Sequence, residues 1–336
     1  MKVLVTGAAG YIGSVTTETL LDAGYEVVAL DNLEGGERAA VHEDATFIQA
    51  DLRDRAALME VFSTYRPEAV LHFAAYALVG ESMERPNEYF QNNVGGACNL
   101  FDAMLAHNCL RFVFSSSCTV YGQPEQMPDT EDLPRQSLNP YGATKIMIEE
   151  MTEWHTRLKG LRAAILRYFN PAGASVRFAE DRAYETHLIP LTLAVAAGER
   201  PSVTIHGDDY PTPDGTCIRD YIHVVDVAEA HVRALKGLEE HPLLELNIGR
   251  GVGSSVLEVI ETARRVTGHP IPAVVGPRRP GGADSAATYA DPTRAEQILA
   301  WKATRTLDAM IASAWDWKQR HPQGYSNSSD VAALKE

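Results

Sequence analysis

The sequence predicts an α/β fold in which a doubly wound parallel sheet is joined to a smaller α/β lobe. One observation is the alternation of strand and helix patterns along the first half of the chain. Strand-like runs at residues 2–6, 25–30, 46–50, 69–73, 111–115 and 162–167 alternate with helical stretches near 11–23, 54–65, 86–107 and 140–159. The second observation is a glycine-rich turn that joins the first strand directly to the first helix.

This turn runs from Gly7 through Gly10 to Gly13 and encloses Tyr11 and Ile12. Glycines at such a junction let backbone amides approach a pyrophosphate closely. The N-terminus of the following helix adds unpaired donors and the positive end of its dipole. With a β-branched strand before it and a helical pattern after it, the turn predicts a Rossmann-type dinucleotide site.

Asp31 follows the second strand, where a carboxylate can accept both hydroxyls of an adenine ribose and would repel a 2′-phosphate. The sequence therefore favours NAD over NADP. Because Asp31 and Asn32 also form a good turn dipeptide, a surface-turn role is the alternative for Asp31. Asp51 and Leu52, which follow the third strand, are candidates for contact with the adenine edge.

A second lobe is predicted after Pro171, where the alternation stops and Pro, Gly and charged residues become frequent. Residues 226–236 then resemble a helix and residues 244–248 a strand, both returning to the large sheet. We therefore expect a dinucleotide domain and a second ligand-binding domain. They comprise residues 1–170 with 226–250, and residues 171–225 with 251–336, respectively.

The bulk properties narrow the class of protein. The chain has 336 residues, 45% of them hydrophobic, which is enough for a large core, and a formal net charge of −15 that argues against nucleic acid and anionic membranes as partners. No run approaches the roughly 18 apolar residues of a membrane span, and the N-terminus begins a strand, so we expect a cytoplasmic protein. The cysteines and histidines lack metal-ligand spacing, so we expect reduced thiols and no metal.

A tyrosine, a lysine and a serine form a candidate catalytic triad. Tyr141 stands four residues before Lys145 on the predicted helix 140–159, and Ser117 ends a serine run upstream. Free tyrosine has a pKa near ~10, so a base of this kind needs a stabilised phenolate. Side chains at i and i+4 share a helix face, so Lys145 together with a cationic cofactor can supply the charge. Such pairs also occur on helices that have no catalytic role.

Two predicted helices carry apolar stripes at helical spacing. They comprise Phe90, Val94, Ala97, Phe101 and Met104 on the first, and Met147, Met151 and Trp154 on the second. Both stripes can belong to the core. Alternatively, two such helices from each of two copies can form a four-helix seam, and we expect a homodimer.

From its first strand to about Tyr325, the chain resembles the UDP-glucose 4-epimerases (UDP-galactose 4-epimerases) of the extended short-chain dehydrogenase/reductase family. The resemblance is carried by VLVTGAAGYIG (3–13), HFAA (72–75), VGES (79–82), NNV (92–94), FSSSCTVYG (114–122), YG (141–142), LRYFNP (166–171), GDDYPT (207–212), DGT (214–216), RDYIHV (219–224) and HPQGY (321–325). It implies tightly held NAD on the large domain and a UDP-sugar bound by the smaller one.

By position, the resemblance implies that Tyr141 is the base that takes the 4-hydroxyl proton and that Ser117 is its hydrogen-bonding partner. Lys145 would grip the nicotinamide ribose and lower the tyrosine pKa. Oxidation at C4 would give a 4-keto sugar, and rotation followed by re-reduction would interconvert UDP-glucose and UDP-galactose.

The resemblance also implies the remaining site residues. Those expected at the cofactor are Gly7, Gly10, Tyr11, Ile12, Gly13, Asp31, Asn32, Asp51, Leu52, Phe73, Ala74, Ala75, Asn92, Ser115, Tyr141, Lys145 and Tyr168. Those expected at the substrate are Ser117, Tyr141, Asn170, His187, Leu188, His206, Arg219, Arg279 and Asp284. A salt-bridge role is the alternative for each of the two arginines, and a packing role is the alternative for Phe73.

Several positions depart from the family pattern, among them Ala77, where a lysine is usual, and His187, where an asparagine is usual. His206 stands where an aromatic side chain often stacks on uracil, and Asp284 lies in a lengthened or shifted segment. Thr288 lies at the gate that decides whether an N-acetyl group fits, and a threonine leaves acetamido sugars open.

Other functions compete with C4 epimerisation of UDP-hexoses. UDP-N-acetylhexosamines and UDP-uronic acids are alternative substrates. A nucleotide-sugar 4,6-dehydratase would share the fold, but it needs an acid pair where this chain has Cys118 and Thr119. A non-catalytic NAD-binding regulator would not need Ser117, Tyr141 and Lys145 together.

Overall fold

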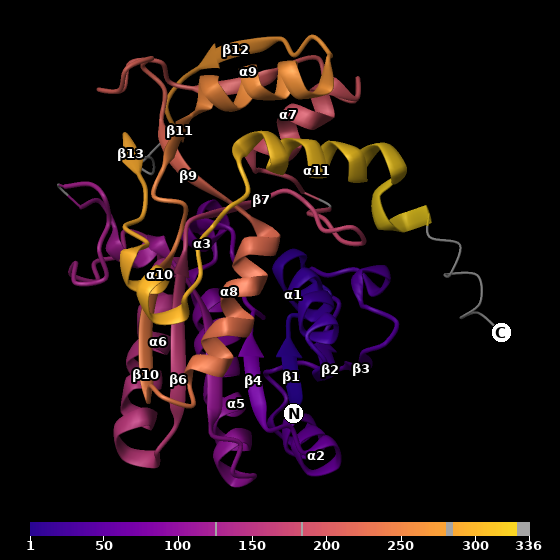
Figure 1. Cartoon of the computed structure of the whole chain (residues 1–336), viewed down its shortest axis with the longest axis vertical. Helices are drawn as coiled ribbons and strands as arrows, with labels where there is room; N and C mark the ends of the chain where they lie inside the picture. The colour runs from indigo at the N-terminus through magenta and orange to yellow at the C-terminus, as the bar shows by residue number, and fades with distance from the viewer. Residues whose placement is uncertain (125, 183, 280–284, 328–336) are drawn as a thin grey trace.

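The computed structural model describes residues 1–124, 126–182, 184–279 and 285–327 (Figure 1). Its main sheet has seven strands in the order β10-β6-β5-β4-β1-β2-β3, and every neighbouring pair is parallel. The strands are β1 (Lys2–Thr6), β2 (Glu26–Asp31), β3 (Thr46–Gln49), β4 (Ala69–His72), β5 (Arg111–Ser117), β6 (Arg162–Tyr168) and β10 (Leu243–Ile248). The predicted doubly wound fold is confirmed.

Helices cover both faces of this sheet because successive side chains of each buried strand point to opposite sides. Val3 and Val5 belong to the core cluster that contains helix residue Leu20. Leu4, between them, belongs to the cluster that contains helix residue Phe62. The helices are α1 (Tyr11–Asp22) and α8 (Val224–Gly237) on the first face, and α2 (Arg55–Tyr65), α5 (Gly96–Ala106) and α6 (Pro140–Lys159) on the second.

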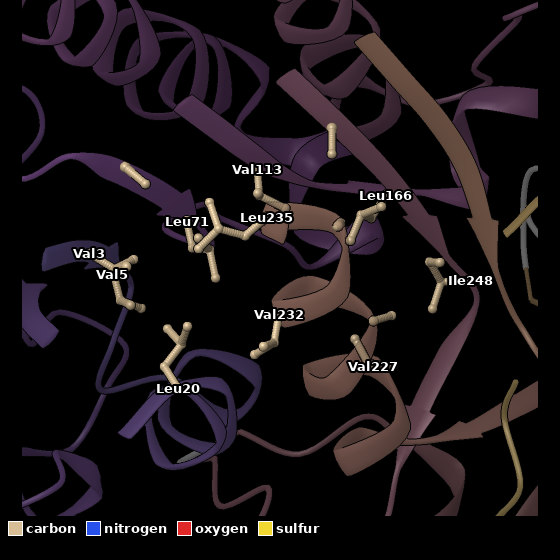
Figure 2. Close-up of a cluster of buried hydrophobic side chains, with 14 of the residues drawn as sticks. Val3, Val5, Leu20, Leu71, Val113, Leu166, Val227, Val232, Leu235 and Ile248 are labelled. Atoms are coloured by element: carbon tan, nitrogen blue, oxygen red, sulfur yellow. The ribbon is translucent and has the colours of Figure 1, made fainter. Parts of the chain in front are cut away.

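Helix α8 returns the chain from the second lobe to the main sheet. Figure 2 shows Val232 and Leu235 of α8 directed at the same cluster as Leu71 and Val113 of the central strands. Strand β10 then pairs with β6 at the edge of the sheet. Strand β1 and the part of α8 around Leu235 thus share one core although they lie far apart in the sequence.

The predicted helix 86–107 is interrupted in the structure. Its first part is α4 (Pro86–Tyr89), a π-helical segment follows at Phe90–Gly95, and α5 completes it. Ala97, Phe101 and Met104 are buried in the core, so the first apolar stripe is a core stripe. Short helix α3 (Val79–Glu84) precedes α4 and was not predicted.

The second lobe is built from short elements at the carboxyl edge of the main sheet. Strand β9 (Ile218–His223) pairs with β7, β11 and β13, and β8 pairs with β12. These are β7 (Asn170–Ala172), β8 (Val203–His206), β11 (Gly253–Ser255), β12 (Ala273–Gly276) and β13 (Ala287–Thr288). The accompanying helices are α7 (Leu188–Ala196), α9 (Val256–Thr267) and α11 (Leu307–Arg320), with 3₁₀ turns at Arg38–Ala40, Cys118–Tyr121 and Gly324–Asn327 elsewhere.

The contacts that tie the lobes together include one made by a helix and one made by a tyrosine hydroxyl. Helix α10 (Thr293–Leu299) packs on α8 and β10, and its residue Ala295 belongs to the core of the main sheet. The hydroxyl of Tyr11, in the first turn of α1, donates to the carbonyl of Gly173 at 2.6 Å. In the described part of the chain, no helix combines the length and apolar character needed to cross a bilayer.

Candidate active site

The carboxyl ends of β1, β2, β4 and β5 border a cavity of about 570 Å³. Its lining contains every residue that the sequence predicted for the cofactor. These are Gly7, Gly10, Tyr11, Ile12, Gly13, Asp31, Asn32, Asp51, Leu52, Phe73, Ala74, Ala75, Asn92, Ser115, Tyr141, Lys145 and Tyr168. We call this space the first cavity.

The glycine turn is shaped by the close approach of backbones. Gly7 has φ +72°, and a Cβ on Gly13 would lie 2.0 Å from the carbonyl oxygen of Gly7, so α1 can start this close to β1 only with glycine there. A Cβ on Gly10 would meet only that same oxygen, at 3.4 Å, and would otherwise project into open space. The turn thus leaves a cradle at the N-terminus of α1 that fits the pyrophosphate of a dinucleotide.

Asp31 serves as a turn residue. Its carboxylate accepts hydrogen bonds from the backbone N–H groups of Ala9 at 2.9 Å and Leu33 at 2.8 Å. Burial raises its pKa, and these two hydrogen bonds oppose the rise. Because each oxygen retains accepting capacity and the side chain borders the first cavity, the turn role leaves room for a ribose contact.

The carboxylate of Asp51 is firmly ionised at the same end of the cavity. Arg53 contacts it at 2.6 and 2.9 Å and Asn32 at 3.0 Å. The hydrogen bonds from Arg53 are the main cause of a pKa well below the usual range for aspartate. This arginine was not singled out from the sequence, although its position two residues after Asp51 is the available signal.

Helix α6 begins at Pro140 and places Tyr141 in its first turn. Asn139 caps it by accepting a hydrogen bond from the N–H of Gly142 at 2.8 Å, and proline suits the first helical position. Lys145 follows one turn later on the same face. Its amine lies 5.6 Å from the centroid of the Tyr141 ring.

The first and last residues of the serine run at the end of β5, Ser115 and Ser117, contact the candidate pair of Lys145 and Tyr141. The Lys145 amine donates to the carbonyl of Ser115 at 2.7 Å. Ser117 hydrogen-bonds with Tyr141, and its Oγ also accepts from the N–H and hydroxyl of Thr119 at 3.2 and 3.0 Å. Ser117 does not line the first cavity itself, so it contacts the site through the phenol.

The pKa of Tyr141 lies above its ordinary value in the protein alone. Burial raises it to about 12, while the hydrogen bond with Ser117 and the charge of Arg182 oppose the rise. Burial also lowers the pKa of Lys145 to about 7, against the charge of Glu149. The expected effect of Lys145 together with a bound cofactor stays a prediction, and in the protein alone burial dominates the pKa of both groups. The reason is that desolvation penalises the charged form of both groups.

Glu149, which was not predicted as a site residue, anchors α6 to the sheet. Its fully buried carboxylate accepts from Ser116 of β5 at 2.5 Å and from Arg167 of β6 at 2.9 and 2.7 Å. Arg135 adds a contact at 3.2 Å. Its place one turn after Lys145 is the signal that could have revealed it, because a buried amine needs a nearby counter-charge.

A second cavity of about 780 Å³ lies on the side of the second lobe. Six predicted substrate residues line it: Asn170, His187, Leu188, His206, Arg219 and Arg279. Asp284 lies outside the described residues. Thr288 is hydrogen-bonded to Ser285 at 2.6 Å and lines neither described cavity, so its predicted gating role gains no support here.

Comparison with known proteins gives one consistent result. Residues 3–249 match the NAD dependent epimerase/dehydratase family. The UDP-glucose 4-epimerase of Halalkalibacterium halodurans is 48% identical over 333 residues, covering 98% of this chain and 99% of that protein. The structure of UDP-glucose 4-epimerase from Bifidobacterium longum in complex with NAD+ and UDP has a TM-score of 0.92 at 41% identity, covering 96% and 100%. The UDP-Glc/GlcNAc 4-epimerase from Campylobacter jejuni has a TM-score of 0.83 at 36% identity, covering 95% and 99%.

The low pKa of Lys145 predicts a measurable pH effect on stability. Between pH ~7 and ~10.5 the unfolded chain holds a proton on this amine that the folded chain releases, so folding stability rises with pH there. Lys145→Met removes this dependence. We expect urea unfolding of nucleotide-free protein to show this. Across this window, the free energy of unfolding of wild type should rise relative to that of the variant by up to about 1.4 kcal/mol per pH unit.

Lys302→Met is the control, because Lys302 is largely exposed. The difference in free energy of unfolding between Lys302→Met and wild type should stay constant across the same pH window. The same constancy for Lys145→Met would contradict the lowered pKa.

Proposed function

Because the chain belongs to the NAD-dependent epimerase/dehydratase family, we propose that it interconverts UDP-glucose and UDP-galactose by inverting C4 with tightly bound NAD. One observation carries the proposal. Tyr141 and Lys145 line the same cavity as the glycine turn, next to a second cavity whose lining includes Asn170, Arg219 and Arg279. A proton acceptor, a dinucleotide cradle and an anion-binding lobe therefore meet in one place.

The residues of the first cavity fit NAD. The cradle at Gly10 suits its pyrophosphate, Asp31 its adenine ribose, and Lys145 its nicotinamide ribose. NAD supplies a hydride acceptor that becomes a hydride donor, so a sugar can be oxidised and reduced again without net change. The Asp31 carboxylate would repel a 2′-phosphate, which favours NAD over NADP.

Tyr141 is the proposed base and acid. Its phenol oxygen takes the proton of the sugar 4-hydroxyl and later returns it to the opposite epimer. Ser117 fixes the phenol and favours its ionised form. Lys145, held by the carbonyl of Ser115, orients the ribose beside it. Burial of these groups keeps water away from the exposed carbonyl of a 4-keto sugar.

The neighbourhood of Ser117 argues against elimination of water. Burial raises the pKa of the Cys118 thiol to about 12, and the hydroxyl of Thr119 donates to Ser117. Neither group is a carboxylic acid of the kind that would protonate a leaving hydroxyl. C4 epimerisation is therefore favoured over 4,6-dehydration.

A direct assay tests the function. Purified protein incubated with UDP-galactose and no added NAD should form UDP-glucose, because the cofactor is not consumed. Chromatography of the nucleotide sugars measures the product. Absence of interconversion in protein whose NAD content has been verified would refute the proposal.

Tyr141→Phe tests the role of the phenol. The variant should keep its NAD, since only one oxygen is removed, but lose about 10²–10⁴-fold in turnover because the proton acceptor is gone. Tyr65→Phe on α2 is the matched control and should behave as wild type. Near-normal turnover in Tyr141→Phe would mean that another group is the base.

The second apolar stripe supports a homodimer. On α6, Met147, Trp154 and Leu158 are exposed at helical spacing, while Met151 packs partly on the core. An apolar stripe on one helix face marks a contact surface, and a twofold axis would place it against its own copy. We therefore propose that α6 forms the centre of the dimer interface.

Trp154→Glu should convert the dimer to a monomer, because it places a charge in the centre of an apolar contact. Light scattering coupled to gel filtration measures the mass. Val275→Glu, at an equally exposed position on β12, should leave the dimer intact. A dimeric Trp154→Glu variant would exclude this face of α6.

The cysteines support a cytoplasmic location as part of the proposal. All four, Cys98, Cys109, Cys118 and Cys217, are free thiols. Free thiols of this kind are typical of a reducing compartment.

A further inference from the structure

A cluster of charged side chains lies in the irregular segment between β7 and α7. Arg182 Nε donates to Glu180 at 2.8 Å, and His187 Nδ1 contacts the same carboxylate oxygen at 2.7 Å. Glu180 is almost fully buried, whereas Arg182 keeps 30% of its side chain exposed. The acid is thus the fixed centre, and the guanidinium is the part that faces open space.

The open space that Arg182 faces is the boundary between the two cavities. Arg182 lines both of them, as do Tyr11, Ala179, Tyr184 and Asp181, whose carboxylate accepts from the N–H of Tyr325 at 2.8 Å. Among the described residues that line both, Arg182 is the cationic one. Its charge also reaches the reactive centre, since it opposes the rise in the pKa of Tyr141.

The guanidinium is only partly used within the protein. Glu180 engages Nε, and within residues 1–124, 126–182, 184–279 and 285–327 the two terminal amino groups make no hydrogen bond. A guanidinium held at one edge presents its other donors as a planar fork, which suits two oxygens of a phosphate. Glu185 also lies in the cluster, but its carboxylate already accepts from the N–H groups of Thr186 and His187.

The chemistry of the two proposed ligands indicates which group Arg182 would contact. In a chain of net charge −15, an anionic ligand needs local positive charge. Both ligands of the proposed function carry a diphosphate as their anionic group. A side chain shared by the two cavities is in a position to contact either one.

We infer that Arg182, oriented by Glu180 and His187, is a further binding residue of the site and that it holds a diphosphate at the junction of the two cavities. The inference rests on the proposed function. The diphosphate belongs either to the nucleotide sugar or to the dinucleotide. Glu180 acts through Arg182 and is a positioning residue.

Arg182→Gln tests the inference in the NAD-loaded enzyme. It keeps a polar, uncharged side chain and removes both the positive charge and the planar set of guanidinium donors. Calorimetric titration with UDP measures one source of diphosphate, and the NAD that stays bound after gel filtration measures the other. A lost charge-assisted contact should weaken one of them by about 10- to 100-fold.

Arg177→Gln is the matched control. Arg177 lies in the same irregular segment, pairs with Glu18 and Glu43, and lines neither cavity. It should bind UDP and retain NAD as wild type does.

The two measurements, UDP affinity and NAD retention, distinguish the possible outcomes. Weaker UDP binding with full NAD retention assigns Arg182 to the nucleotide sugar, and a smaller effect on UMP would place it at the second phosphate. Loss of NAD with unchanged UDP affinity at saturating NAD assigns it to the dinucleotide. If both quantities equal those of Arg177→Gln, the pair with Glu180 is merely structural and the inference is overturned.

Arg182→Lys and the wild-type enzyme serve as two further controls. If circular dichroism shows that Arg182→Gln is misfolded, Arg182→Lys decides, because it keeps the charge but loses the fork. Wild-type UDP affinity and NAD retention in Arg182→Lys would then overturn the inference. Wild-type enzyme that neither binds UDP nor converts UDP-galactose would refute the proposed function instead.

Discussion

The buried carboxylate of Glu149 is the interaction on which the geometry of the site depends. It receives hydrogen bonds from Ser116 on β5 and Arg167 on β6, so it joins α6 to two central strands of the sheet. Charges in such surroundings hold their geometry tightly because separating them leaves an uncompensated ion in a medium of low dielectric. Tyr141 and Lys145 lie on the same helix, so the contacts of Glu149 also fix their position relative to the sheet. The same carboxylate also favours the protonated form of Lys145.

Burial has two opposite effects at the reactive tyrosine. It excludes water, which protects a reactive carbonyl, but it also disfavours the phenolate and the ammonium that the proposed chemistry uses. Additional positive charge near the phenol is therefore required. The charge of Arg182 and the hydrogen bond with Ser117 already oppose the rise, yet the pKa of Tyr141 stays at about 12. The electrostatics of the site are thus distributed over both lobes.

The sequence predicted best where local signals are strong. The strand at residues 2–6 and the helix at 140–159 match the structure at both ends, since β-branched residues, Asn139 and Pro140 mark their limits. The π-helical turn at Phe90–Gly95 was not predicted, because apolar spacing does not report a change in the hydrogen-bond pattern. The raised pKa of Tyr141 depends on tertiary burial. Arg182 lies in an irregular segment that carries no periodic signal.

The hydrogen bond from Tyr11 to Gly173 has a consequence for protein engineering. Tyr11 belongs to the glycine turn that borders the first cavity, yet its hydroxyl also makes a hydrogen bond between the two lobes. Replacing it to accommodate a different dinucleotide would remove this hydrogen bond between the lobes. A redesign that preserves this tyrosine and varies the residues after β2 instead separates cofactor choice from lobe orientation.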